Sequence, residues 1–304
     1  MKMLITGGAG FVGSHLCDKY VNDGNEVICL DTGDLSNVSH LLENKKHFRK
    51  ATTDITDWLS LSHFIGYERF DAIIHLAAQI RVDRAISNPS FTWNVNVDGT
   101  YNLLEAARMF NVKKFLFASS SEVYGSAQYI PIDENHPLGT NSIYGASKIA
   151  GDRICHAYAS TYGMDIGILR PFNIYGPRQT AGVASIFIDK VLKGISPSIQ
   201  GDGSQSRDYI YIDDIVSAYN CMLYAKSPGV VNFGTGIETS VKELAETIIN
   251  MCKQNIKPEY RDAPPNTTMS LIADIYKAKK LGWEPKYNLE AGIEEFINWY
   301  KVKK

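Results

Sequence analysis

Short apolar runs alternate with segments of helical periodicity along the first 170 residues. The apolar runs predict buried strands, and apolar positions three or four residues apart predict helices. Strands are predicted at 2–5, 26–30, 71–76, 114–118 and 165–169, and helices at 11–22, 101–110 and 143–162. Asn141 or Ser142 can cap the last of these helices. Such alternation is typical of βαβ units, a parallel sheet and right-handed crossovers.

The rhythm changes after Arg170, where proline and glycine interrupt the chain more often. Helices are predicted at 183–192, 212–225 and 241–252, and a strand at 230–233. We therefore expect an α/β protein with a doubly wound parallel sheet. Residues 1–170 are expected to form a dinucleotide-binding domain of the Rossmann type, and residues 171–304 mainly a smaller, irregular lobe. Some later segments are expected to return to the first sheet.

The composition is that of an ordinary globular chain. Hydrophobic residues make up 44%, charged residues 21%, and the net charge is -2. This balance favours neither nucleic acid nor an anionic membrane as a partner. The apolar runs stay short of the roughly 18 residues of a membrane span, and the N-terminus is not typical of a signal peptide.

The cysteines and histidines suggest no metal and no disulfide framework. Five cysteines include no C-x-x-C pair, so we expect reduced core thiols and a cytoplasmic protein. The seven histidines lack ligand-like spacing, and no metal is predicted. The cysteines are Cys17, Cys29, Cys155, Cys221 and Cys252.

A glycine-rich turn separates the first predicted strand from the first helix. Gly7, Gly10 and Gly13 have the spacing G-x-x-G-x-x-G. Glycine lets the backbone turn sharply and approach a pyrophosphate closely, and the helix N-terminus supplies free N–H groups. An ordinary glycine turn is the alternative, but the strand–turn–helix context favours a dinucleotide site.

Asp31 ends the second predicted strand, 18 residues after Gly13. A carboxylate at this place binds the ribose hydroxyls and repels a 2′-phosphate. Neither Arg nor Lys occurs between Asp31 and Leu42. The sequence therefore favours NAD over NADP, unless Asp31 is simply a surface residue in a turn.

Tyr144 and Lys148 are four residues apart on the long predicted helix, so their side chains share one face. A nearby ammonium favours the phenolate, and we expect it to lower the pKa of Tyr144 toward neutrality. Tyr144 could then be a general base for a hydroxyl, with Lys148 at the nicotinamide ribose. The alternative is a surface pair. Ser119 to Glu122 follow a strand end, where α/β sheets place chemistry.

The chain resembles the extended short-chain dehydrogenase/reductase family of nucleotide-sugar epimerases and dehydratases over nearly its whole length. The matching motifs occur in the family's order and are highly specific for it. They are Gly7–Gly13, Asp54-Ile55, His75–Ala78, Asn96–Thr100, Ser119–Gly125, Tyr144–Lys148, Arg170–Pro177 and Gly201–Asp214.

The resemblance implies a sheet of about seven strands, tightly bound NAD and a nucleoside-diphosphate sugar, most simply a UDP-sugar such as UDP-GlcNAc. It implies that Ser120 hydrogen-bonds the sugar O4, that Tyr144 takes the O4 proton, and that the C4 hydride reduces NAD to leave a 4-ketone. The implied cofactor-binding residues are Gly7, Gly10, Phe11, Val12, Gly13, Asp31, Asp54, Ile55, Leu76, Ala77, Ala78, Asn96, Tyr144 and Lys148. The implied substrate-binding residues are Arg81, Ser121, Asn173 and Arg207.

Glu122 separates the reactions that can follow the ketone. A 4,6-dehydratase must remove the C5 proton and expel the 6-hydroxyl, which a carboxylate can do; a 4-epimerase needs no third acid or base. Ser121 stands where the dTDP-glucose dehydratases have Asp, so Glu122 would serve as both base and acid. We favour elimination, with a UDP-sugar 4-epimerase, a UDP-glucuronate decarboxylase and a non-catalytic NAD-binding sensor as alternatives. Glu122 could also only hydrogen-bond its own turn.

Other features leave the substrate and assembly open. Arg81 either faces the substrate or is a solvated loop residue. Pro264 to Thr267 replace the family's R-x-G-D segment, which puts an Arg contact to the diphosphate, and hence uridine, in doubt. Helices 101–110 and 143–162 match the family's four-helix dimer interface and predict a homodimer. The apolar residues Leu103, Leu104, Ile149 and Ile154 would fill it, or be buried within the monomer.

Overall fold

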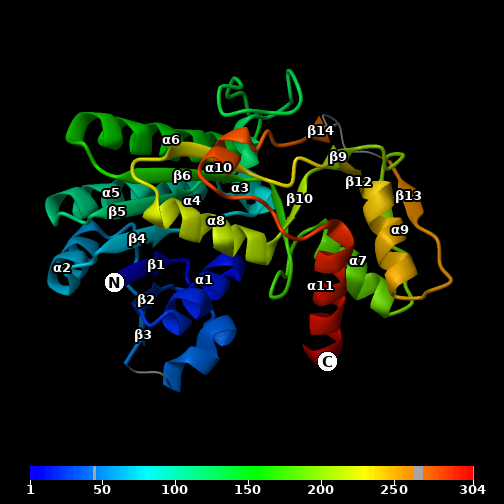
Figure 1. Cartoon of the computed structure of the whole chain (residues 1–304), viewed down its shortest axis with the longest axis horizontal. Coiled ribbons are helices and arrows are strands. Elements are labelled where there is room, and N and C mark those ends of the chain that lie inside the picture. The colour runs from blue at the N-terminus through cyan, green and yellow to red at the C-terminus, as the bar shows by residue number, and fades with distance from the viewer. Residues whose placement is uncertain (44–45, 263–269, 304) are drawn as a thin grey trace. The chain divides into compact units, whose positions relative to one another are not determined.

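The computed structural model describes residues 1–43, 46–262 and 270–303 (Figure 1). The chain forms two compact units, each built from more than one stretch of sequence. The first unit comprises Met1–Gly125, Leu138–Arg170 and Val216–Val231. The second unit comprises Ser126–Pro137, Pro171–Ile215 and Asn232–Lys304.

A seven-stranded sheet organises the first unit, in the order β11-β6-β5-β4-β1-β2-β3. Strand order runs outward in both directions from β1, and β1 pairs in parallel with both β2 and β4. The predicted doubly wound parallel sheet is therefore confirmed. The strands are β1 Lys2–Thr6, β2 Glu26–Leu30, β3 Phe48–Ala51, β4 Ala72–His75, β5 Lys114–Ala118, β6 Ile166–Pro171 and β11 Gly229–Phe233.

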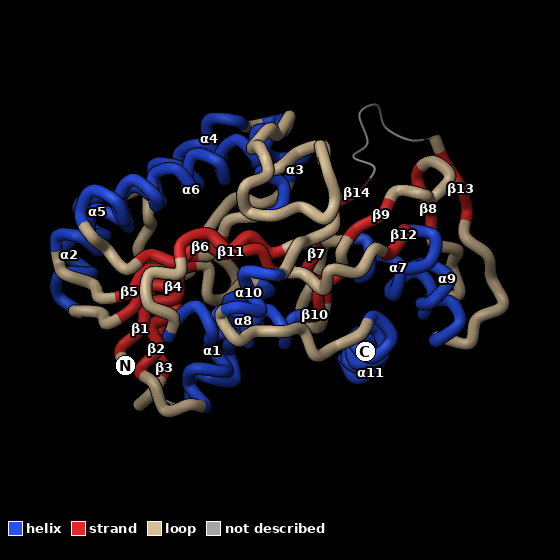
Figure 2. Tube along the Cα trace, turned by 45° about the horizontal axis from the view of Figure 1, so that its top comes forward, coloured by secondary structure: helices blue, strands red, loops and turns tan. Residues whose placement is uncertain are grey.

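Helices cover both faces of this sheet, with α2, α5 and α6 on one side and α1 and α8 on the other (Figure 2). The predicted bounds of the long helix α6 are confirmed, and Ser142, not Asn141, is its cap, because Ser142 Oγ accepts the Gly145 N–H at 2.9 Å. The helices are α1 Phe11–Asn22, α2 Trp58–Glu68, α3 Val82–Ser87, α4 Pro89–Trp93, α5 Gly99–Met109, α6 Ile143–Tyr162 and α8 Ile212–Tyr224, with short turns η1 Ser36–Glu43, η2 Asn94–Asp98 and η3 Ser121–Val123.

Among its described residues, the second unit contains three small sheets, in the orders β10-β7, β12-β9-β14 and β13-β8. The buried Asp208 carboxylate ties its loops together by accepting the N–H groups of Thr235, Gly236 and Ala273. The strands are β7 Asn173–Tyr175, β8 Ser198–Gln200, β9 Ser206–Arg207, β10 Tyr209–Tyr211, β12 Thr239–Ser240, β13 Glu259–Arg261 and β14 Ser270–Leu271. The helices are α7 Val183–Leu192, α9 Val241–Met251, α10 Tyr276–Lys280 and α11 Leu289–Lys303.

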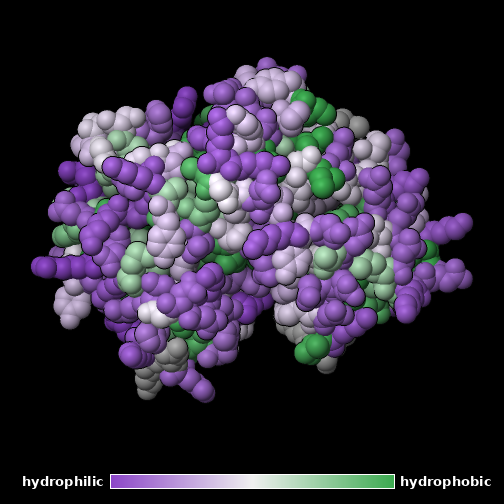
Figure 3. Space-filling view, viewed as in Figure 1, coloured by the Kyte–Doolittle hydropathy of each residue, from purple (hydrophilic) through white to green (hydrophobic). Residues whose placement is uncertain are grey.

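The main hydrophobic core of the first unit lies between the helices α2, α5 and α6 and the sheet, with residues from β1, β2, β4, β5 and β6. Cys155 belongs to it, and Cys17 and Cys29 are also buried, but Cys221 and Cys252 are only partly buried, so the prediction of core thiols is wrong for these two. The face seen in Figure 3 is mostly hydrophilic, with scattered apolar groups. Within the described ranges, no helix is long and apolar enough to cross a membrane.

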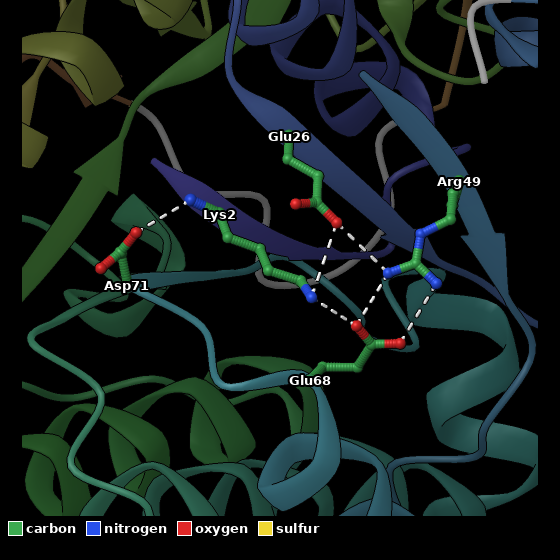
Figure 4. A network of polar contacts seen from close by, with 5 residues as sticks. All are labelled: Lys2, Glu26, Arg49, Glu68 and Asp71. Carbon is green, nitrogen blue, oxygen red and sulfur yellow. Dashed lines mark hydrogen bonds and ion pairs between the residues drawn. The ribbon is translucent and has the colours of Figure 1, made fainter. Parts of the chain in front are cut away.

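Four charged side chains meet at the ends of β1, β2, β3 and α2 (Figure 4). Glu68 is at the centre: its carboxylate accepts from Lys2 Nζ at 2.6 Å and from Arg49 Nη2 at 2.7 Å. Glu26 contacts the same two cations at 3.5 Å and 3.3 Å and is more exposed than Glu68. Glu68 therefore joins α2 to two strands of the sheet.

We expect Glu68→Gln to lower the free energy of unfolding by about 1–2 kcal/mol at neutral pH, because hydrogen bonds to a charged, mostly buried acceptor are lost. The hydrogen bond from Arg49 has the largest effect on the pKa of the Glu68 carboxyl, which it holds below its usual value. Its contribution is therefore present at neutral pH and lost as pH falls through that lowered pKa. Denaturation curves across pH measure this, with Glu26→Gln as the matched control. Equal effects of the two substitutions would contradict the assignment.

Candidate active site

The turn between β1 and α1 is tightly packed, and its glycines have no room for side chains. Gly7 has φ +68°, and a Cβ there would lie 2.8 Å from the Ala77 nitrogen. A Cβ on Gly13 would collide with the Gly7 carbonyl. The first residues of α1, Phe11 and Val12, are half-buried. This arrangement brings the N-terminus of α1 close to the ends of β1 and β4, which suits a bound pyrophosphate.

Asp31 follows β2 and lies against the same turn. Its Oδ2 accepts the Ala9 N–H at 3.0 Å, and its Oδ1 accepts the Gly33 N–H at 2.8 Å. Asn37 Nδ2 donates to the Ala9 carbonyl at 3.0 Å, which fixes the turn from the other side. The carboxylate is thereby held beside the glycine turn, as a ribose-binding carboxylate must be.

Asp54 and Ile55, two of the expected cofactor-binding residues, have different surroundings. Asp54 is exposed and organises its own turn, because its Oδ1 accepts both the N–H and the hydroxyl of Thr56. Ile55 is buried in the core, and a Cβ on Gly99 would lie 2.6 Å from its Cδ1. Packing alone therefore accounts for the side chain of Ile55.

A chain of hydrogen bonds runs from β1 through β4 to η2. Thr6 Oγ1 accepts the Ala77 N–H at 3.2 Å and lies 2.7 Å from His75 Nδ1. His75 Nε2 lies 2.9 Å from Thr100 Oγ1, which donates to the Asn96 carbonyl at 2.6 Å. Because the Thr100 hydroxyl donates elsewhere, it accepts from His75, which places the proton of this imidazole on Nε2. Burial, and to a smaller extent the positive charge of Lys148, lowers the pKa of His75 to about 3, so the ring is neutral.

Asn96 connects that chain to α6. Its side chain accepts the Gln79 N–H at 2.7 Å and donates to the Gln79 carbonyl at 3.0 Å and to Ser147 Oγ at 2.9 Å. Ser147 in turn donates to the Tyr144 carbonyl at 2.7 Å. Asn96 lies in η2, a π-helical turn, a feature often found at functional sites. The segment containing Leu76, Ala77 and Ala78 is therefore tied to both the glycine turn and α6.

Ser120, Glu122 and Tyr144 come together at the end of β5. Ser120 Oγ accepts the Glu122 N–H at 3.2 Å, and the Ser120 hydroxyl hydrogen-bonds the Tyr144 phenol. Burial raises the pKa of Tyr144 to about 12; Ser120 acts against this rise, and the charge of Glu122 adds to it. The expectation of a phenol pKa near neutrality is therefore wrong for the protein alone, because desolvation outweighs the hydrogen bond from Ser120 and the charge of Glu122 acts in the same direction as desolvation.

Lys148 is buried beneath this group. Its Nζ donates to the Ala118 carbonyl at 2.8 Å and lies 5.9 Å from the centre of the Tyr144 ring. Burial lowers the pKa of Lys148 to about 8. Tyr144 and Lys148 are thus on one face of α6, as the sequence predicts, rather than an exposed surface pair.

The four residues expected to bind substrate are divided between the two units. In the first unit, Arg81 is exposed and forms an ion pair of 2.7 Å with Asp83, whereas Ser121 is buried. In the second unit, Asn173 pairs with β10, and Arg207 Nη1 donates to the Ser206 carbonyl at 2.7 Å. Pro264 to Thr267 lie outside the described residues.

The fold and the site of the first unit define a dinucleotide-dependent enzyme of the short-chain dehydrogenase/reductase type. The family model for GDP-mannose 4,6 dehydratase matches residues 4–296. A putative UDP-glucose 4-epimerase of Methanocaldococcus jannaschii is 42% identical, with 98% of this chain and 98% of that protein covered.

Two solved structures are similar over nearly the whole chain. The UDP-glucose 4-epimerase of Thermotoga maritima with UDP-glucose has a TM-score of 0.95 and 32% identity, with coverage of 100% and 99%. The dTDP-glucose 4,6-dehydratase DesIV of Streptomyces venezuelae, with NAD and TYD bound, has a TM-score of 0.92 and 30% identity, with coverage of 99% and 97%. The chain belongs to the family of NAD-dependent nucleotide-sugar epimerases and dehydratases.

Proposed function

We propose that the protein oxidises a nucleoside-diphosphate hexose at C4 and then eliminates water across C5 and C6. The observation that carries this proposal is the position of Glu122, an exposed residue whose charge acts on the Tyr144 phenol. A reaction that stopped at the ketone, or only returned the hydride, would need no carboxylate beside that phenol.

The residues of the first unit divide the chemistry among them. Ser120 orients the sugar O4 and Tyr144 removes its proton. When bound beside the glycine turn and Asp31, NAD would supply reversible hydride exchange, taking the hydride of C4 and giving it back to the sugar after elimination, so that the oxidised cofactor is restored. The ketone acidifies C5–H, so Glu122 takes the C5 proton and returns it to the departing 6-hydroxyl, which leaves as water. One carboxylate performs both transfers, because Ser121 is buried and carries no acid.

The glycine turn and Asp31 support NAD as the cofactor. The turn has no space for side chains at Gly7 or Gly13, and the Asp31 carboxylate beside it would meet a 2′-phosphate with like charge. Relatives with bound NAD, such as DesIV, agree with this choice. Asp54, Leu76, Ala77, Ala78 and the N-terminus of α1 complete the proposed cofactor site.

We expect the protein to bind NAD more tightly than NADP, and Asp31→Asn to weaken NAD binding by about 10–100-fold through loss of charge-assisted hydrogen bonds. Equilibrium dialysis against both dinucleotides measures this. Asp34→Asn is the control, since Asp34 is an exposed acid nearby that holds only the Ser36 turn. Tighter binding of NADP by the unaltered protein would contradict the assignment.

A UDP-sugar 4-epimerase is the second candidate, and the relatives of that name favour it. NMR separates the two reactions: the protein is incubated in deuterium oxide with UDP-GlcNAc, UDP-glucose, dTDP-glucose and UDP-glucuronate. Elimination removes the 6-hydroxyl, and where the resulting 5,6-double bond is then reduced to a methyl group, solvent deuterium enters at C5. Epimerisation inverts C4 and exchanges no carbon-bound hydrogen. Loss of the carboxyl group from UDP-glucuronate would identify a decarboxylase, and no turnover of any sugar would leave a non-catalytic NAD-binding protein.

The second unit is the proposed substrate lobe, with Asn173 toward the sugar and Arg207 toward the diphosphate. The guanidinium of Arg207 suits phosphate oxygens, because its donors form a planar fork. For Arg81 the ion pair with Asp83 favours the solvated-loop reading. A cytoplasmic location remains a prediction from the cysteine usage.

We also propose a homodimer through α5 and α6. Leu103 and Leu104 cannot fill the interface as expected, because both are fully buried in the core; Ile149 and Ile154 are half-buried. Large apolar side chains on these two helices are exposed instead, and they are the proposed interface: Tyr101, Met109, Ile143 and Tyr162.

Sedimentation at micromolar concentration is expected to give twice the 33.8 kDa of one chain. Tyr101→Glu should shift the protein to monomer, because it places a charge in an apolar contact. Tyr67→Glu is the control, since Tyr67 is an exposed tyrosine on α2, outside the proposed interface. A 33.8 kDa species alone in the unaltered protein would refute the dimer.

A further inference from the structure

A buried ion pair lies one helical turn beyond Lys148. Asp152 is 2% exposed and Arg170 is 4% exposed. Arg170 donates to Asp152 Oδ2 through Nε at 2.7 Å and lies 2.6 Å from it through Nη2. Arg170 Nη1 also donates to the Tyr124 hydroxyl at 2.9 Å. Because these three side chains come from α6, β6 and the end of η3, the carboxylate has a fixed position.

Lys148 needs a counter-charge at this place. Its side chain is almost fully buried, its Nζ donates to the Ala118 carbonyl at 2.8 Å, and it lies 5.2 Å from the centre of the Phe117 ring. A carbonyl and an aromatic face do not neutralise an ammonium, and an isolated buried charge is costly. Asp152, four residues further along α6, shares the helix face of Lys148.

We propose that Asp152 is a positioning residue for the reaction, an inference that rests on the proposed function. Paired with Arg170, Asp152 supplies the buried counter-charge that keeps Lys148 protonated and in place behind Tyr144. Arg170 holds Oδ2 of the carboxylate, while Lys148 Nζ is held at the Ala118 carbonyl, within reach of the phenol. The ammonium can then stabilise the phenolate when Tyr144 becomes the base.

The other titratable groups around Lys148 do not compete for this role. Burial lowers the pKa of Lys148 to about 8, and Asp152 opposes this, followed by Cys155. The His75 imidazole has a pKa of about 3 and stays neutral. Burial raises the pKa of the Cys155 thiol well above its usual value. Burial also raises the pKa of Asp152, and Arg170 acts in the opposite direction; the contacts of 2.7 Å and 2.6 Å from the Arg170 guanidinium favour the carboxylate form. Of the groups named here, only the Asp152 carboxylate shares the α6 face of Lys148 and has the opposite charge.

Asp152→Asn is the direct test, in the full-length protein loaded with NAD. The substitution removes the carboxylate and leaves the Arg170 cation without its partner. The loss of a nearby negative charge and the unpaired positive charge both disfavour the Lys148 ammonium. We expect the Lys148 titration, followed by the Nζ shift of ¹⁵N-lysine and assigned by its loss in Lys148→Met, to move down by about one pH unit. The fall of kcat on the alkaline side of its pH profile should shift down by the same amount. At pH values above the Lys148 pKa of both proteins, kcat of the variant should be about tenfold lower than that of the unaltered protein, with KM little changed.

Asp165→Asn is the matched control, because it breaks the partly buried pair of 2.8 Å with Lys114 in the same unit, away from Lys148. If the role of Asp152 is purely structural, both variants should lower stability and leave the alkaline fall of kcat at the same pH. That result would overturn the proposal. If Asp152→Asn does not fold, Asp152→Asn combined with Arg170→Met removes both charges together, a change that buried pairs tolerate better. Its Lys148 titration should still lie below that of the unaltered protein, and an unchanged titration would count against Asp152.

The two readouts separate this inference from the proposed function. If no nucleotide sugar is converted, the proposed function fails, but the ¹⁵N titration still decides whether Asp152 controls the charge of Lys148. If sugars are converted and the titration does not move in Asp152→Asn, the proposed function stands and the role of Asp152 is wrong.

Discussion

Tyr144→Phe is expected to reduce turnover by about 10²–10⁴-fold, the range lost when a positioned general base is removed. The phenol hydrogen-bonds Ser120, the Lys148 ammonium lies 5.9 Å from the ring centre, and the side chain is half-buried. Phenylalanine keeps that packing and removes only the oxygen that exchanges the O4 proton. NAD binding should survive, because the glycine turn and Asp31 are untouched.

Tyr158→Phe is the matched control for this substitution. Tyr158 is on the same helix, and its hydroxyl donates to Glu105 Oε2 at 3.0 Å, away from Ser120 and Lys148. Turnover of each variant is compared with the NAD released on denaturation. Retained turnover in Tyr144→Phe would remove the phenol from the mechanism, and loss of NAD would make Tyr144 an anchor of the cofactor instead.

The sequence predicted the parallel sheet well because strands and helices of the first unit have different periods. The predicted bounds of α1, β2, β5 and α6 are confirmed. The helix α2 was missed, although Asp57 caps it, because its face toward the core is narrow: within α2 the fully buried residues are Leu61 and Ile65. The small sheets of the second unit were missed because strands of two or three residues carry no measurable alternation.

The candidate site was partly predictable for a related reason. The spacing of Tyr144 and Lys148 is local, so the helix period alone puts them on one face. The same four-residue step leads from Lys148 to Asp152, but its meaning depends on Arg170 from β6, which is distant in sequence. The hydrogen-bond chain through His75 likewise joins three separate elements. The pKa of Tyr144 was mispredicted because a sequence shows neighbours but not the depth of burial, which here has the larger effect.

Glu122→Gln is expected to abolish elimination while oxidation at C4 continues. Glutamine keeps the size of the side chain and the backbone contact to Ser120 Oγ, but it can neither accept the C5 proton nor return it to the 6-hydroxyl. We expect formation of the dehydrated product to fall by about 10²–10³-fold, with reduced nicotinamide accumulating on the protein. Removing the charge that raises the pKa of Tyr144 should not slow proton transfer from O4.

The outcome decides between the two proposed reactions, because only elimination needs a base at C5. The variant and the unaltered protein are compared for deuterium uptake at C5, for product, and for the absorbance of reduced nicotinamide after mixing with each nucleotide sugar. Glu26→Gln is the control, since it makes the same acid-to-amide change at the start of β2, in the charged cluster around Glu68. Full activity of Glu122→Gln, together with simple exchange of C4 epimers by the unaltered protein, would exclude the dehydratase. The 4-epimerase would then be the function of this site, and Glu122 would only organise its own turn.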